Sequence, residues 1–229
     1  MRMATIAVVV AVAIVLCGLA SAQTLSTSNS PVKVLGKFTC TQSADVQEGH
    51  QLTRVTGVGP VSLQNVSSKR IIAFVVKIDA SCGYIGTHKV YSHDMIYKAM
   101  AMPVGDMMAL PVEVDEGRTG DVGFQSGTLS VVPQFIQFED GSTWGDSSLG
   151  APFGIARSDA YSWQANLRSI SDDTEFNAEL NKPVDPASMV VFIQRSLQIT
   201  RDQSGLATVR TTIDDRMATY NARIANGKF

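Results

Sequence analysis

The sequence predicts an α+β protein, in which an N-terminal antiparallel β-sandwich (residues 32–148) precedes a C-terminal segment of two to three helices (residues 149–229). Glycine usage changes near this boundary: of the 17 glycines after residue 22, 15 come before residue 155. Glycine marks turns and breaks helices, so its loss indicates a change of architecture. Apolar residues alternate along several runs before the boundary, as in strands. After it they recur every three or four positions, as in helices.

The composition is that of a folded protein without a nucleic-acid surface. The 229 residues are 45% hydrophobic, which supplies enough apolar surface for a core and excludes disorder for most of the chain. The 19 basic side chains stand against 21 acidic ones, and neither part of the chain has a strong excess of one sign. Binding to phosphate backbones needs a clustered positive surface, so we expect no nucleic-acid partner.

The first 22 residues predict an export signal. Arg2 provides a positive start, an apolar run follows, and Ala20-Ser21-Ala22 has the small-x-small pattern that signal peptidase cleaves. We expect cleavage before Gln23, a flexible tail over residues 23–31, a secreted or periplasmic location and no stable membrane span after cleavage. The alternative is a retained anchor, because the uncharged run that precedes the cleavage site is long enough to cross a bilayer.

Cys40 and Cys82 are the two cysteines left after cleavage. In an oxidising compartment, an even pair of cysteines predicts a disulfide. The alternative is a catalytic thiol at Cys82 that acts with His88 or His93, but this requires a reduced thiol in a compartment where disulfides form.

Strand patterns follow one another through the first part of the chain. The strongest is RIIAFVVKIDA (residues 70–80), in which Ile72, Phe74, Val76 and Ile78 share one face. Further strands are expected at residues 32–40, 61–66, 88–100, 107–114, 127–132 and 135–138, with a turn at residues 103–106. A series of short strands with turn signals between them fits a two-sheet sandwich.

The segment FIQFEDGSTWG (residues 135–145) predicts a tight hairpin, because Asp140-Gly141 lies between β-formers and both residues tolerate positive φ. Trp144 then lies across from a residue of the preceding strand. Two roles stay open for Trp144. It forms a ligand contact together with Asp140, as aromatic platforms do in sugar-binding modules, or it is a cross-strand packing partner that closes the end of the sheet.

The stretch NVSSKRIIAFVV (residues 65–76) resembles the second strand of exported immunoglobulin- or fibronectin-like modules, in which a polar Asn-x-Ser-x-Lys corner leads into an apolar strand. Together with the FEDGSTWG ending, residues 60–145 are similar to uncharacterised secreted bacterial proteins with an N-terminal sandwich. The resemblance implies an immunoglobulin-like sandwich and an exported location, and no activity follows from it. Unlike antibody domains, the chain has no tryptophan between its two cysteines.

Helical spacing dominates the second part. One helix is expected to carry Ala160, Trp163, Leu167 and Ile170 on one face after a Ser158-Asp159 cap, and a second helix to begin near Pro186. Residues 206–224 form the clearest helix, whose apolar stripe consists of Leu206, Val209, Ile213, Met217, Tyr220 and Ile224. A stripe of this kind packs against the rest of its own chain or, as the alternative, pairs between chains in a homo-oligomer.

Motifs for metal or cofactor chemistry do not occur. The sequence has no HExxH, no CxxC, no calcium loop, no Walker loop and no dinucleotide fingerprint, so we expect no metal site and no cofactor. His88 and His93 lie five positions apart, and a regular strand places them on opposite faces. Two alternatives remain: a metal or acid/base site at His93-Asp94, and a glycosidase pair of carboxylates. The candidate carboxylates are Glu113, Asp115, Glu116, Glu139 and Asp140.

These observations predict an exported, non-catalytic protein that binds an unidentified protein or glycan partner or has a structural role in the cell envelope. We assign no catalytic residue. The alternatives are a secreted hydrolase with dispersed histidine and acidic residues, and an interaction protein that forms oligomers through residues 206–224. A concave pocket with converging histidine and acidic side chains favours the enzyme, whereas a flat, polar surface favours the binding module.

Overall fold

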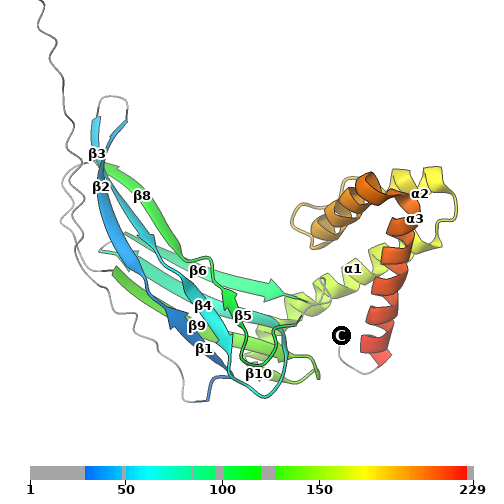
Figure 1. The fold of residues 1–229 in the computed structure, drawn as a ribbon, viewed down its shortest axis with the longest axis horizontal. Coiled ribbons are helices and arrows are strands. Elements are labelled where there is room, and N and C mark those ends of the chain that lie inside the picture. Colours follow the sequence, from blue (N-terminus) through cyan, green and yellow to red (C-terminus); the bar gives the residue numbers. More distant parts are fainter. Residues whose placement is uncertain (1–28, 48–49, 84, 96–100, 120–126, 226–229) are drawn as a thin grey trace, which may run out of the picture.

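The computed structural model describes residues 29–47, 50–83, 85–95, 101–119 and 127–225. The predicted signal, its cleavage site and residues 23–28 of the predicted tail lie outside these ranges. Within them, ten strands form three antiparallel sheets, and three helices follow (Figure 1). This arrangement confirms the predicted α+β class.

One layer of the β-rich part consists of three pairs of consecutive strands, and the two strands of each pair follow one another across a bend. The strand β1 (Val32–Gly36) leads into β2 (Thr39–Gln47), β3 (His50–Val58) leads into β4 (Val61–Asn65), and β7 (Met107–Ala109) leads into β8 (Glu113–Thr119). The sheets β1-β4-β7 and β2-β3-β8 are therefore the two ends of this layer. At the bend, Gly36 has φ +124°, and a Cβ there would lie 1.9 Å from the carbonyl oxygen of Pro60. Only glycine fits this close approach of two backbones.

The other layer is a four-stranded sheet in the order β10 (Thr143–Gly145), β9 (Gly127–Phe138), β5 (Ile71–Cys82) and β6 (Ile85–Asp94). The single strand β9 replaces the two expected runs at residues 127–132 and 135–138. Pro133 is tolerated within it because it lies beside a register shift, opposite Val76, where the ladder is already interrupted. Residues 96–100 of the strand expected at 88–100 lie outside the described residues.

The core lies between the two layers and is crossed by a covalent bond. Phe38, Leu63, Phe74 and Ile78 are buried in one apolar cluster to which all three sheets contribute. The predicted Cys40–Cys82 disulfide is confirmed, with Cα atoms 5.7 Å apart, and it joins β2 to β5. This bond leaves no free thiol for the alternative of a catalytic Cys82.

The outer face of β5 is covered by the start of the helical part. A 3₁₀ turn (Ser147–Gly150) leads into α1 (Ala151–Ser169), and Phe153 packs with Ala73, Val75 and Phe135 on that face. The expected cap at Ser158-Asp159 is wrong, because α1 begins about two turns earlier. Pro152 in the first turn is compatible with this earlier start, since a proline there loses no helical hydrogen bond.

The helix α3 (Val190–Ala225) consists of two halves that meet at Gly205, whose φ of 81° and ψ of 169° are not helical. These halves are the second and third helices that the sequence predicts, although the first half begins at Val190 rather than near Pro186. Ile213 and Leu197, one from each half, lie in a second apolar core with Leu167 of α1. From Leu206 to Tyr220 the stripe is therefore packed within the chain, the side chain of Ile224 lies outside the described residues, and pairing between chains stays a prediction.

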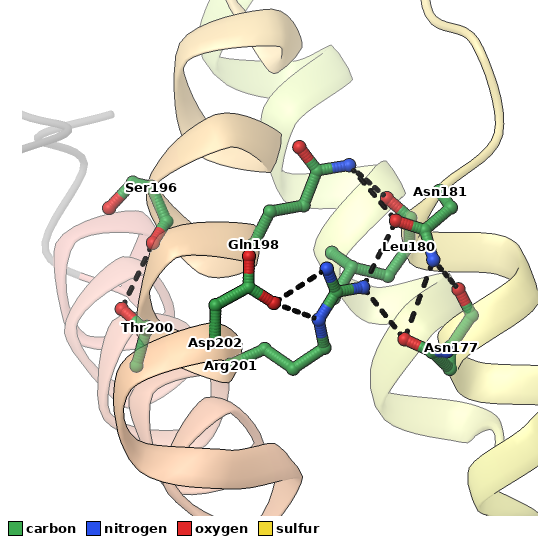
Figure 2. Close-up of polar contacts among 8 residues, drawn as sticks. All are labelled: Asn177, Leu180, Asn181, Ser196, Gln198, Thr200, Arg201 and Asp202. Carbon is green, nitrogen blue, oxygen red and sulfur yellow. Dashed lines mark hydrogen bonds and ion pairs between the residues drawn. The ribbon is translucent and has the colours of Figure 1, made fainter.

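Sequence reasoning missed α2 (Asp173–Leu180), which is held on the first half of α3 by polar contacts (Figure 2). Arg201 donates from Nη1 to the side-chain oxygens of Asn177, at 2.8 Å, and Asn181, at 3.0 Å. Gln198 donates from Nε2 to the carbonyl oxygen of Leu180 at 3.1 Å. The Gln198 donor satisfies a carbonyl oxygen that the end of α2 leaves without an intrahelical partner. In the described part of the chain, no helix combines the length and hydrophobicity that a membrane span requires.

Candidate functional site

The hairpin that carries the predicted contact residues Trp144 and Asp140 has a longer loop than expected. Its loop has three residues (139–141) rather than two, and the amide of Phe138 donates to the carbonyl oxygen of Ser142 at 2.9 Å. Gly141 takes φ +86°, as a three-residue loop requires of its last position. Trp144 lies across from Ile136, as predicted, and is half-buried against the sandwich core. This placement supports a packing role, and a ligand contact at Trp144 stays a prediction.

Asp140 is engaged within the same loop. Its Oδ1 accepts a hydrogen bond from the backbone amide of Ser142 at 3.0 Å, and its Oδ2 lies 2.7 Å from Nζ of Lys69. The Lys69 ammonium, followed by the Ser142 donors, holds the pKa of Asp140 well below its usual value. The carboxylate therefore fixes the turn, and a ligand contact at Asp140 also stays a prediction.

His88 and His93 lie on opposite faces of β6, as the spacing predicts. His88 is paired across the sheet with Asp79 and contacts it through Nδ1 on an exposed face, and this hydrogen bond lowers the pKa of Asp79. His93 is paired with Phe74 and stacks on Tyr91, with ring centroids 6.0 Å apart. Consecutive strand residues usually point to opposite sides, and an acid/base site at His93 and Asp94 stays a prediction.

Among the carboxylates considered for a glycosidase pair, Glu139 and Asp140 are used in surface contacts, and Glu113 is exposed. Glu139 lies 3.3 Å from Arg70, and both side chains are more than one third exposed. The side chains of Asp115 and Glu116 lie outside the described residues. Within the described ranges, no group of three or more histidine, cysteine, aspartate or glutamate side chains is arranged to hold a metal ion.

A buried ion pair joins the sandwich to the helical part. Arg157 of α1 donates from Nε to Oδ2 of Asp94 at 2.8 Å and from Nη2 to Oδ1 at 3.0 Å. Its Nη1 donates to Oε1 of Gln137 in β9 at 2.8 Å. The side chains of Arg157 and Asp94 are only 1% and 3% exposed. A bidentate pair with no access to solvent fixes both the position and the rotation of α1 on the sheet.

Beside this ion pair, a groove of about 670 Å³ separates the end of β6 from the first half of α3. One wall is the start of α1, with Pro152, Phe153 and Ala156, and the opposite wall carries Met189 and Phe192. Phe192 is 66% exposed, which is unusual for a large apolar side chain. The remaining lining residues are Ser92, His93, Asp94, Ala187, Ile193, Ser196 and Arg216. A concave, mainly apolar site with a few polar groups is typical of ligand binding.

Among the described residues that line this groove, Arg216, on the second half of α3, is a cation without an ion-pair partner. Its Nη2 lies 3.4 Å from Oγ of Ser196, and its Nη1 is shielded from solvent without a hydrogen-bond partner among the described residues. In the same part of the chain, no carboxylate lies within ion-pair distance of Arg216. Burial lowers the pKa of Arg216, as expected for a guanidinium removed from water without a counter-charge.

Sequence reasoning missed both arginines of this region. Arg157 has a signal in hindsight, because it lies three residues before Ala160 on the buried face of α1, where a charge needs a partner. Arg216 has no such signal, since it adjoins the exposed Asp215 and its environment depends on how the halves of α3 fold back. The groove is concave and mainly apolar, and its lining includes one histidine and one acid, His93 and Asp94, so the hydrolase alternative stays a prediction.

Comparisons with known proteins found no relative of this chain. No family model, no curated protein and no solved structure matches this chain.

Proposed function

We propose that the protein is an exported, non-catalytic binding protein, whose site is the groove between the sandwich and the helical part. The observation that carries this proposal is the groove itself, with an apolar wall from α1 facing the exposed Phe192. The buried Arg157–Asp94 pair supports it, because a preorganised groove binds with a smaller loss of entropy than one that must form on binding.

The export part of this proposal rests on the N-terminal sequence and is supported by the disulfide, since disulfides persist in oxidising compartments. Mass spectrometry of the exported protein should give an N-terminus at Gln23. A full-length product retained in the membrane would contradict cleavage and would favour the anchor instead.

The groove is tested with a neutral, apolar fluorophore such as N-phenyl-1-naphthylamine, whose emission rises in apolar surroundings. We expect saturable binding to the mature protein. Ala156→Trp should abolish it, because Ala156 lines the groove and an indole there fills the space. Ala207→Trp is the matched control, since Ala207 is exposed on α3 and does not line the groove. Equal binding by the three proteins would contradict the proposed site.

A further inference from the structure

We propose that the groove binds a single-chain amphiphile with an anionic head, whose hydrocarbon chain lies between α1 and Phe192 and whose head contacts Arg216. This inference rests on the proposed function and names the class of its ligand. Three features of the groove carry it: the charge of its lining, the donors of Arg216, and the size and polarity of its walls.

The charge of the lining favours an anion. Asp94 is the carboxylate of the groove, and both of its oxygens are engaged by Arg157 at 2.8 Å and 3.0 Å. Asp94 therefore offers little attraction to a cationic ligand, because its charge is already compensated. Arg216 has no such compensation within the described residues, so one net positive charge faces the groove. An anionic head is attracted and a cationic head repelled, which is the basis of discrimination between ligands of equal chain length.

The donors of Arg216 are incompletely used. A guanidinium carries five N–H donors in a rigid fork, and a carboxylate or phosphate can accept two of them at once. Ser196 is the acceptor near Arg216, and at 3.4 Å its hydroxyl is at the long limit of a hydrogen bond. Ser92 and Ser196 add hydroxyls to the same lining. An anionic head would accept hydrogen bonds from the Arg216 N–H groups that have no partner among the described residues. The site is partly removed from water, where such hydrogen bonds are strong.

The walls favour a hydrocarbon chain over a sugar or a peptide. Phe153, Met189, Phe192 and Ile193 supply apolar contact along the groove, and methionine adapts to irregular apolar shapes. A groove of about 670 Å³ lies within the range of about 300–1,000 Å³ found for small-molecule sites. Among the described lining residues, the polar groups beyond the one cation and the two hydroxyls are His93 and Asp94, and Asp94 is engaged by Arg157. A ligand with many hydroxyls would therefore leave most of them without partners.

The test compares three ten-carbon competitors, decanoate, decanol and decyltrimethylammonium, in the displacement of N-phenyl-1-naphthylamine at neutral pH and below their micelle concentrations. We expect decanoate to displace the fluorophore at a concentration about tenfold lower than decanol, as one charge-assisted contact provides, and the cation to be the weakest. Arg216→Gln should remove the preference for decanoate while the neutral fluorophore still binds. Arg195→Gln, an exposed arginine outside the groove, should leave the preference unchanged.

The outcomes separate the two proposals. If the fluorophore binds the wild type but decanoate and decanol compete equally, the anionic ligand class is wrong and the binding groove stands. The same holds if Arg195→Gln and Arg216→Gln lower the preference equally, because a general effect of surface charge then explains it. If the fluorophore does not bind the wild type, or binds Ala156→Trp equally well, both proposals are wrong.

Discussion

Removal of Asp94 should destabilise the protein far more than removal of an aspartate from a surface ion pair. In Asp94→Ala, the guanidinium of Arg157 loses two charge-assisted hydrogen bonds while it stays 1% exposed, and Gln137 remains as its partner among the described residues. The loss of one partner from a buried pair costs about 3–5 kcal/mol, because the other charge is left desolvated and uncompensated. The free energy of unfolding of an ordinary domain is about 5–15 kcal/mol, so the loss expected for Asp94→Ala is a large share of the total.

The chain supplies a matched control for this experiment. Arg168 and Asp214 also form an ion pair, with 2.6 Å between Nε and Oδ1, but their side chains are 55% and 54% exposed. Asp214→Ala should therefore cost less than about 1 kcal/mol, as exposed pairs usually do. The double variant Asp94→Leu with Arg157→Leu should lie closer to the wild type than Asp94→Ala does, because no unpaired charge remains in it.

Urea unfolding at neutral pH, followed by circular dichroism with the disulfide intact, measures these differences. The slope of the transition should be checked in each variant, since a changed slope would mean that the helical part unfolds separately from the sandwich. Equal costs for Asp94→Ala and Asp214→Ala would refute the account, because they would show that water reaches the Arg157–Asp94 pair and that it does not hold α1 on the sheet.

Three further predictions concern the helices and the hairpin. Ile213 is 1% exposed, so Ile213→Asp should cost more than about 4 kcal/mol, whereas Asp215→Ala on the exposed face should change stability by less than about 0.5 kcal/mol. Small, equal shifts in thermal melts would contradict burial of the stripe. Gly205→Ala should cost about 1–3 kcal/mol in urea titrations, because φ 81° and ψ 169° suit only glycine. Gly154→Ala, at an exposed position of α1, should instead stabilise the protein by about 0.5–1 kcal/mol. A stabilising Gly205→Ala would show that the two halves of α3 tolerate a continuous helix. The depressed pKa of Asp140 provides stability above its usual value of 3.8 that is lost as the pH falls toward the folded-state pKa. Melts between about pH 5 and about pH 2 should therefore show a steeper loss for the wild type than for Asp140→Asn, and parallel losses would contradict the Lys69–Asp140 contact.

Patterns that depend on local spacing predicted much of the fold. The alternation in residues 70–80 placed Phe74 and Ile78 in the core, and the stripe around Ile213 identified the second half of α3. The strands of the bent layer were found only in part. The run HQLTRVTGV of β3 mixes polar and apolar residues, so its alternation is weak. The helix α2 had a signal that sequence reasoning overlooked, since the side chain of Asp172 accepts a hydrogen bond from the amide of Glu175.

The groove could not be predicted in the same way, because its walls come from segments that are distant in sequence. Ser92, Pro152 and Phe192 all line the groove, although tens of residues separate them in the chain. Their approach depends on the Arg157–Asp94 pair and on the turn at Gly205, and neither forms a local pattern. A single sequence therefore indicates that Phe192 is apolar without indicating that it stays exposed.

Hydrogen–deuterium exchange of the mature protein, with and without saturating decanoate, shows where a ligand binds. We expect slower exchange at the two walls of the groove, in residues 152–156 and 189–196, with little change in the hairpin that carries Trp144. Protection confined to that hairpin, or no change at either wall, would contradict a binding site between the sandwich and the helices.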